Sequence, residues 1–278
     1  MYMQIKNLNN TTFEDIVDCF LEAFENYFVE FPKDPSYFKQ RWEMSKINYT
    51  LSYGMFDGIK LVGFILHGIE NRNSHLTAFN LATGVVPDYR GKKITKTIYE
   101  FAISDLITNG ISKCQLEVIK QNTYAVKAYQ NIGFSITKNY KCFSGNIILD
   151  KDFSYELTEI NIQDFNFNLM PNQSLYSWEN QSQSIKRGNF KCFEISNNNQ
   201  TESFFIINNQ SGYIAQLDVL VDYEIAWQHL FHAIYKICET VKINNVDERL
   251  ISKIMHLEKV GLKNTINQYQ MELVLTSS

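Results

Sequence analysis

The chain has 278 residues, 45% of them hydrophobic, and carries a net charge of −4 at pH 7. This balance excludes the strong basic field that would draw a protein to nucleic acid or to an anionic membrane surface. No apolar run approaches the ~20 residues needed to cross a bilayer. We therefore expect a soluble protein with no nucleic-acid or membrane partner, long enough for two domains of about 140 residues each.

The cysteines and histidines give no sign of a metal or disulfide framework. The five cysteines are far apart, none forms a CxxC pair, and no histidine lies close enough to complete a zinc site. The five histidines show no catalytic constellation either. Residues 1–6 lack a charged-then-apolar signal pattern. We expect reduced thiols, no metal and a cytoplasmic location.

Hydrophobic spacing in the first 150 residues predicts strands that alternate with helices. Asp57 and Gly58 join two strand patterns, and this pair is a good hairpin signal. The expected elements are a strand at 4–7, a helix at 12–28, a shorter helix to 46, strands at 51–56, 60–67 and 75–86, a helix at 94–109, a strand at 113–119, a short helix at 122–132 and two strands within 134–149. This order predicts an α/β fold with a mixed sheet flanked by helices.

The second half repeats part of this order. Residues 151–157 are the expected linker, and a polar stretch follows them. The elements expected after that stretch are strands near 190–195, 203–208 and 213–220, a helix at 227–241, a short strand, a helix at 250–257 and a final strand. We expect two domains, residues 1–150 and residues 151–278.

The loop at residues 87–93 joins a strand to a helix. Such a junction presents unpaired backbone N–H groups and the positive end of the helix dipole, which suits a phosphate. Gly91 permits an unusual backbone excursion, and Arg90, Lys92 and Lys93 add positive charge. On geometry alone, a solvated basic turn is an equal alternative.

This loop resembles the pyrophosphate motif of the GNAT acetyltransferases, Arg/Gln-x-x-Gly-x-Gly/Ala preceded by Val-x-Pro-x-Tyr. Arg90 and the residues before it match. The two later glycine positions hold Lys93 and Thr95, which departs from the commonest form. Thr95 is small and has a hydroxyl to donate, whereas Lys adopts unusual φ angles less readily than Gly.

A second segment, residues 122–134, matches the same family's pattern Asn-x-x-Ala-x-x-x-Tyr-x-x-x-Gly-Phe at every fixed position. Tyr129 follows Asn122 by seven residues, two helical turns along one face. Taken singly, Asn122 is as well explained as a helix N-cap and Tyr129 as a core residue. The joint match with the loop makes the first half resemble a GNAT acyl-CoA N-acyltransferase domain.

The resemblance implies a cofactor site and a reaction. Residues 80–86 and 113–119 would form strands that part, with the pantetheine arm of acetyl-CoA between them. Tyr129 would protonate the departing thiolate, since a phenol with a pKa of ~10 suits that task. The acceptor would be a primary amine, on a small molecule first and a peptide second, attacking directly without a covalent intermediate. The implied cofactor-binding residues are Val85, Val86, Arg90, Gly91, Lys92, Lys93, Ile94, Thr95, Lys96 and Asn122.

The general base and the acceptor pocket are less defined. Glu117, on the strand at 113–119, is the first candidate base, and Glu30 is the second. For both, a solvated or structural carboxylate is the alternative. The aromatic residues within 24–31 can wall a pocket for a cationic amine. The rival class is a non-catalytic acyl-CoA-binding or protein-interaction module. Either a monomer or a homodimer fits.

The second half reads as a degenerate copy of the first. The residues at 88–90 align with 222–224, which replaces Arg90 by Glu224, and Asn122 and Tyr129 align with Leu250 and Leu257. The alternative is that any α/β segment aligns this well. We interpret the chain as two tandem GNAT copies, the second without a pyrophosphate loop. We also expect residues 155–278 to complete or shield the acceptor site.

Overall fold

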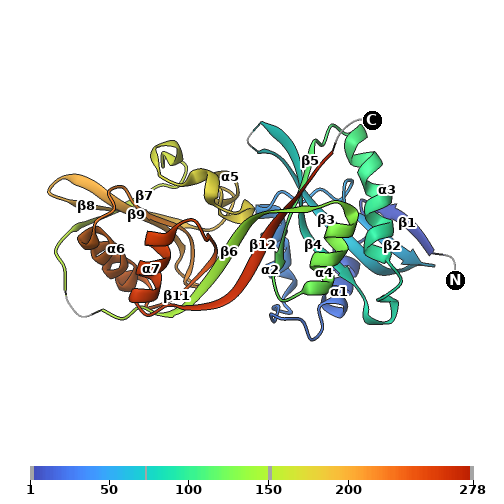
Figure 1. The fold of residues 1–278 in the computed structure, drawn as a ribbon, viewed down its shortest axis with the longest axis horizontal. Coiled ribbons are helices and arrows are strands. Elements are labelled where there is room, and N and C mark those ends of the chain that lie inside the picture. The colour runs from blue at the N-terminus through green and yellow to red at the C-terminus, as the bar shows by residue number, and fades with distance from the viewer. Residues whose placement is uncertain (1–2, 73, 150–151, 276–278) are drawn as a thin grey trace. The chain divides into compact units, whose positions relative to one another are not determined.

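The computed structural model describes residues 3–72, 74–149 and 152–275 (Figure 1). The chain forms two compact units, which we call unit 1 (Met1–Thr137 with Gln270–Ser278) and unit 2 (Lys138–Tyr269). Each has a sheet with helices against it. These units divide at Thr137, and the residues from Gln270 onward belong to unit 1. The domain boundary expected at residue 150 stays a prediction. Within the described residues, no helix is long and apolar enough to cross a membrane.

The sheet of unit 1 contains the predicted hairpin. Asp57 pairs with Lys60, so a two-residue turn joins the strands, and Gly58 takes a φ of 63° there. The strand order is β1 (Met3–Asn7), β2 (Tyr53–Asp57), β3 (Lys60–Arg72), β4 (His75–Val85), β5 (Lys113–Ile119), β12 (Lys263–Val274) and β6 (Ser135–Asn146). β4 and β5 are parallel, and β1 to β4 are joined antiparallel.

Helices cover the sheet of unit 1 at α1 (Phe13–Ala23), α2 (Pro35–Met44), α3 (Ile94–Thr108) and α4 (Thr123–Ile132). α1 packs on β3 and β4, while α3 packs on β2, β3 and β4 and touches α4 (Figure 1). The helix predicted to reach residue 28 is wrong at its end. It stops at Ala23, and Asn26 then adopts a left-handed φ of 59° that a helix cannot contain.

The last described residues of β12 belong to unit 1, where they lie between β5 and β6. The Leu275 N–H donates to the carbonyl of Ser112 at 2.9 Å, and Glu272 lies 3.6 Å from the ammonium of Lys113. Met271 is fully buried. The sheet of unit 1 is therefore completed by residues far away in the sequence.

Unit 2 repeats the plan of a sheet with helices against it. Its described strands are ordered β12, β6, β11 (Thr240–Asp247), β10 (Tyr213–Val219), β9 (Gln200–Asn208), β8 (Lys191–Asn197) and β7 (Glu156–Ile160), and its helices are α5 (Ser182–Ile185), α6 (Glu224–Ile237) and α7 (Ile251–Lys259). Trp227, Leu230, Phe231 and Ile234 are buried on the face of α6 that their spacing predicts.

Three expectations for this part of the chain need correction. β6 is one strand, not two, because its pairing with β11 continues from Asp247 and Tyr140 to Thr240 and Asn146 with only one irregularity. Residues 156–157 of the expected linker are in β7, and residues 150–151 lie outside the described part. The helix expected at 227–241 ends at Ile237, and Val241 of its expected face lies in β11. The polar stretch, as expected without long elements, contains short 3-10 turns at Phe167–Leu169, Gln173–Leu175 and Trp178–Asn180.

Candidate functional site

The strands β4 and β5 part in the middle of unit 1. Their parallel register runs from Thr77 opposite Lys113 to Asn80 opposite Leu116, and it ends there. β4 nevertheless continues to Val85 and β5 to Ile119. In the part of the chain that the structure describes, backbone groups that face the gap have no ladder partner across it, and such groups need another partner. We call this opening the unit 1 gap.

The predicted loop residues at the end of β4 are tied down by the chain itself. The N–H of Val86 donates to the carbonyl of Val62 at 3.0 Å, and Val86 is fully buried. Arg90 donates from Nε to the carbonyl of Val85 at 3.2 Å and from Nη2 to the carbonyl of Ala23 at 3.0 Å. Arg90 thus links the loop to the end of α1.

Two left-handed residues shape the loop that follows. Gly91 has a φ of 76° and Lys93 a φ of 58°. Lys93 therefore adopts the conformation that favours glycine, at a cost of about 1–2 kcal/mol. It is the N-cap of α3 and makes no side-chain capping bond. The first-turn N–H groups of Ile94, Thr95 and Lys96 have no intrahelical partners, so they can meet an anion.

One side chain at the end of the loop is buried and fixes the helix, whereas the lysines around it are exposed. Ile94 is buried against Gly63 of β3, which fixes the start of α3. The Lys92 ammonium lies 4.5 Å from the centre of the Tyr89 ring, and Lys96 lies 3.5 Å from the carboxylate of Glu100. Lys92, Lys93 and Lys96 are exposed, and Thr95 is half-buried. The helix N-terminus is thus open and basic.

Asn122 is placed where the gap meets α4. Its Oδ1 accepts from the N–H of Ala125 at 3.2 Å, which makes it the helix N-cap. Its Nδ2 donates to the Tyr27 hydroxyl at 3.2 Å. Burial raises the pKa of Tyr27, and the bond from Asn122 lowers it. Asn122 therefore both caps α4 and contacts the predicted aromatic segment through Tyr27.

Tyr129 is buried on α4, and its hydroxyl is held in a polar environment. Burial raises its pKa to about 12, against the lowering effect of hydrogen bonds with Thr83 and Asn80. The phenol is consequently protonated at neutral pH. Asn80 also donates from Nδ2 to the Thr83 hydroxyl at 2.7 Å and to the Tyr99 hydroxyl at 2.8 Å. We call Asn80, Thr83, Tyr99 and Tyr129 the hydroxyl cluster.

The two candidate bases have different surroundings. Glu117 is half-buried on β5 and is the first residue beyond the last register pair, so the structure places it at the parting of the strands. Glu30 is exposed and outside any helix or strand. Tyr27 contacts the rings of Phe24 and Phe31 at centroid distances of 4.9 and 6.5 Å. The rings of this segment also pack on Phe20 of α1, and Tyr27 connects the segment to Asn122.

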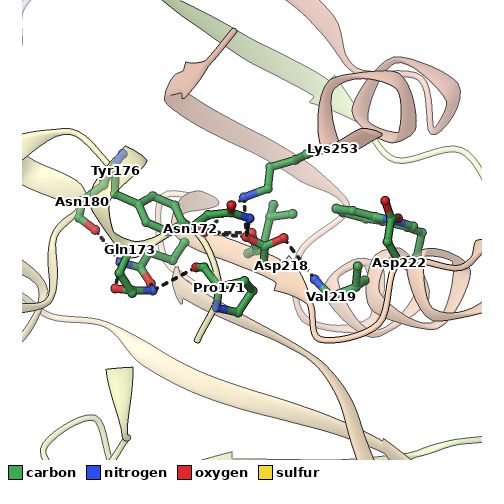
Figure 2. Close-up of polar contacts among 12 residues, drawn as sticks. Pro171, Asn172, Gln173, Tyr176, Asn180, Asp218, Val219, Asp222 and Lys253 are labelled. Atoms are coloured by element: carbon green, nitrogen blue, oxygen red, sulfur yellow. Dashed lines mark hydrogen bonds and ion pairs between the residues drawn. The ribbon is translucent and has the colours of Figure 1, made fainter. Parts of the chain in front are cut away.

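Unit 2 has a comparable parting of strands, which we call the unit 2 gap. β10 and β11 are parallel at a single register pair, Tyr213 opposite Lys242. Beside this gap, the ammonium of Lys253 on α7 lies 2.8 Å from Asp218 on β10 and 3.2 Å from the Tyr176 hydroxyl. Figure 2 shows Asn172 donating to the same carboxylate, at 2.8 Å. Lys253, Asp218 and Tyr176 are buried.

Three residues of unit 2, Glu224, Leu250 and Leu257, align in the sequence with Arg90, Asn122 and Tyr129. Glu224 is the first residue of α6 and follows the N-cap Tyr223 directly, so no basic loop precedes the helix. Leu250 is the N-cap of α7 without a capping side-chain bond, and Leu257 is fully buried. Unit 2 has neither an amide nor a phenol at these positions.

Parted parallel strands, an open basic helix N-terminus and a helix that carries Asn122 and Tyr129 define the class of acyltransferase folds. Residues 13–134 match the model of the acetyltransferase (GNAT) family. This part of the chain is a GNAT domain. A search of curated proteins gives no match.

Solved structures extend the likeness of fold over the whole chain. A putative acetyltransferase from Pyrococcus horikoshii is similar with a TM-score of 0.69 and 15% identity, covering 99% of this chain and 92% of its own. A GCN5-related N-acetyltransferase from Anabaena variabilis has a TM-score of 0.62 and 12% identity, with 99% and 73% covered. A tandem GNAT protein from the clavulanic acid biosynthesis pathway covers 100% of both chains, with a TM-score of 0.66 and 10% identity. The chain therefore has a tandem GNAT fold.

The hydroxyl cluster was only partly predictable. Tyr129 follows from its motif, whereas Asn80, Thr83 and Tyr99 do not. The available signal for Asn80 was an amide within the otherwise apolar sequence of β4, and for Tyr99 its place among Ile98 and Ala102 on the buried face of α3. Neither signal distinguishes a site residue from a structural one.

Proposed function

We propose that unit 1 is an N-acetyltransferase that moves an acetyl group from acetyl-CoA to a primary amine of a small molecule. The observation that carries this proposal is the buried, protonated Tyr129 beside the unit 1 gap, on the same helix as Asn122. The GNAT match of residues 13–134 supports acyl transfer as the reaction class.

The donor set of the loop suits a pyrophosphate. The first-turn amides of α3 and the exposed Lys92 and Lys93 provide hydrogen bonds and positive charge. The pantetheine arm would lie in the unit 1 gap with Asn122 at its edge. A pantetheine amide that binds the Val85 carbonyl would replace or share the bond from Arg90.

The reaction then needs one proton donor and one proton acceptor. The amine attacks the thioester carbon, so a C–N bond forms and the C–S bond breaks. Tyr129, whose phenol is protonated at neutral pH, gives its proton to the leaving sulfur. The proton lost by the nitrogen passes to Glu117, which lies at the parting of the strands. After the products leave, Glu117 releases its proton to solvent and Tyr129 regains one from solvent, so both groups return to their starting states.

The test is release of free thiol from acetyl-CoA with a panel of small primary amines, together with calorimetry of CoA binding. We expect amine-dependent thiol release and one CoA site per chain. CoA binding without any amine-dependent release would contradict the enzyme and support a non-catalytic acyl-CoA-binding module. Release with peptide amines alone would move the acceptor from small molecules to peptides.

A further inference from the structure

A side-chain hydrogen bond joins the two sides of the unit 1 gap where the strands have parted. Asn122 donates from Nδ2 to the Tyr27 hydroxyl at 3.2 Å. The backbone N–H of Asn122 donates to the carbonyl of Ile119, the last residue of β5, at 3.0 Å. Ile119 lies beyond Leu116, where the register of β5 with β4 ends. Asn122 therefore marks the β5 side of the gap.

The segment that carries Tyr27 starts from the β4 side of the gap. The last residue of α1, Ala23, lies against Gly84 of β4, and a Cβ added to Gly84 would meet the Ala23 Cβ at 2.8 Å. Arg90, in the loop after β4, donates from Nη2 to the Ala23 carbonyl at 3.0 Å. The chain then continues from Ala23 through a turn to Tyr27. The bond between Asn122 and Tyr27 therefore connects the end of β4 with the end of β5.

The helix cap fixes which atom of Asn122 donates to Tyr27. Oδ1 accepts from the N–H of Ala125 at 3.2 Å, which is the capping bond of α4. Exchanging the amide oxygen and nitrogen would place an NH₂ group against that N–H, so Nδ2 must be the atom that faces Tyr27. The two bonds use different atoms of the amide. The bond to Tyr27 can therefore open while the cap of α4 stays in place.

Residues 24–31, the aromatic segment, are held mainly by ring packing. All of them are described, and they form turns and bends outside any helix or strand. The rings of Phe24 and Phe31 lie 4.4 and 5.0 Å from the ring of Phe20 on α1. Phe28 is 54% exposed. A surface segment without ladder hydrogen bonds opens at low cost in free energy, so its bond to Asn122 is a contact that can break and re-form.

We propose that Tyr27 is a positioning residue that acts as a latch on the unit 1 gap. Its bond to Asn122 holds the aromatic segment across the parted strand ends, opens when the pantetheine arm of CoA enters, and closes again over the bound arm. This proposal rests on the proposed function, which places that arm between β4 and β5. The arm would enter from the loop that follows β4, and the bond joins the two strand ends at that point.

The experiment measures the association and dissociation rate constants of a fluorescent CoA derivative with the full chain by stopped-flow mixing. Tyr27→Phe keeps the ring beside Phe24 and Phe31 but removes the oxygen that accepts from Asn122. We expect both rate constants to rise by ~3–10-fold, because one hydrogen bond no longer has to break, with Kd changed by less than about threefold. The control is Tyr124→Phe, which removes an exposed hydroxyl from α4 and should leave both rate constants unchanged.

Hydrogen exchange of residues 24–31 provides a second measurement, which we expect to be faster in Tyr27→Phe than in Tyr124→Phe. Equal exchange in the two variants would overturn the proposal, as would an association rate constant in Tyr27→Phe that is unchanged or lower. A rise in the association rate constant alone would also overturn it, because the latch would then not close over the bound arm. A wild type that binds no CoA would instead contradict the proposed function itself.

Discussion

The unit 1 gap and the unit 2 gap have the same strand geometry, but different side chains border them. In unit 1, the parting of β4 and β5 is bordered by Asn80 and Tyr129 and by the carboxyl group of Glu117, with no lysine among these three residues. In unit 2, the parting of β10 and β11 is bordered by the ion pair of Lys253 and Asp218 (Figure 2). Both have parallel strands whose register stops early. The parting of the strands is thus common to both units, and the side chains that border it are what differ.

One position on that helix accounts for much of the difference. Asn122 and Leu250 are the N-caps of α4 and α7. The third residue after each cap is Ala125 in unit 1 and Lys253 in unit 2. Ala125 has no side chain beyond Cβ, whereas the Lys253 ammonium reaches Asp218 on β10. Apolar side chains such as Leu217, Val246 and Leu250 line what remains of the unit 2 gap. The polar groups of Lys253, Asp218 and Tyr176 therefore bond to one another beside this gap.

The largest expected effect is on catalysis in unit 1. Tyr129→Phe keeps the ring but removes the proton, and kcat should fall by roughly 10²–10⁴-fold, as for a lost acid–base group. CoA affinity, measured by calorimetry, should change little. The control is Tyr124→Phe on the same helix, since Tyr124 is exposed. An unchanged kcat at a rate limited by chemistry would exclude Tyr129 as the acid.

The next effect concerns the stability of unit 2. Lys253→Met leaves the carboxylate of Asp218 buried without its cation, which should lower the free energy of unfolding by about 3–5 kcal/mol. Adding Asp218→Leu should restore most of that loss, because the charge is then gone. The control is Lys259→Met, whose exposed pair with Glu224 should contribute less than about 1 kcal/mol. Urea unfolding measures all three; equal losses for Lys253→Met and Lys259→Met would show that the buried pair has no special role.

A smaller effect is expected at the loop. Arg90→Glu removes the bonds to the carbonyls of Val85 and Ala23 and adds negative charge beside the open helix N-terminus. CoA affinity should fall by roughly 10–100-fold, as expected for losing charge-assisted hydrogen bonds. Lys263→Glu makes the same charge reversal at an exposed position of unit 2 and should have little effect. Calorimetry that finds two CoA sites per chain, or equal affinity in both variants, would refute the loop as the binding site.

The smallest effect is a pH dependence in the sheet beside the unit 1 gap. Burial lowers the folded-state pKa of His67 to about 4 from its usual 6.5, so the unfolded chain binds the proton first as the pH falls. The stability contribution is therefore fully present above pH 6.5 and is lost as the pH falls towards 4, at no more than about 1.4 kcal/mol per pH unit. Comparing urea unfolding at pH 7 and pH 5 should show a smaller loss in His67→Phe than in the wild type. The same loss in both would mean that other groups cause it.

Features formed by residues close together in the sequence could be predicted, and features assembled from distant segments could not. Asn122 and Tyr129 share one helix, so a fixed spacing identifies them, and the basic loop is a continuous segment. The hydroxyl cluster is assembled from β4, α3 and α4, and no fixed spacing connects Asn80 to Tyr99. Lys253 lies on a short amphipathic helix, where a lysine ordinarily faces solvent. Its burial depends on Asp218 and Tyr176, which are far from it in the sequence.

The end of β12 lies in the sheet of unit 1, and this has a consequence for synthesis. A ribosome makes residues 1–137 first, then the whole of unit 2, and only afterwards the strand residues that lie between β5 and β6. At ~5–20 residues per second, the first unit must wait on the order of ten seconds with an unpaired sheet edge. A message cut short within unit 2 would leave that edge unpaired for good. Completion of the unit 1 sheet thus requires that unit 2 has already been made.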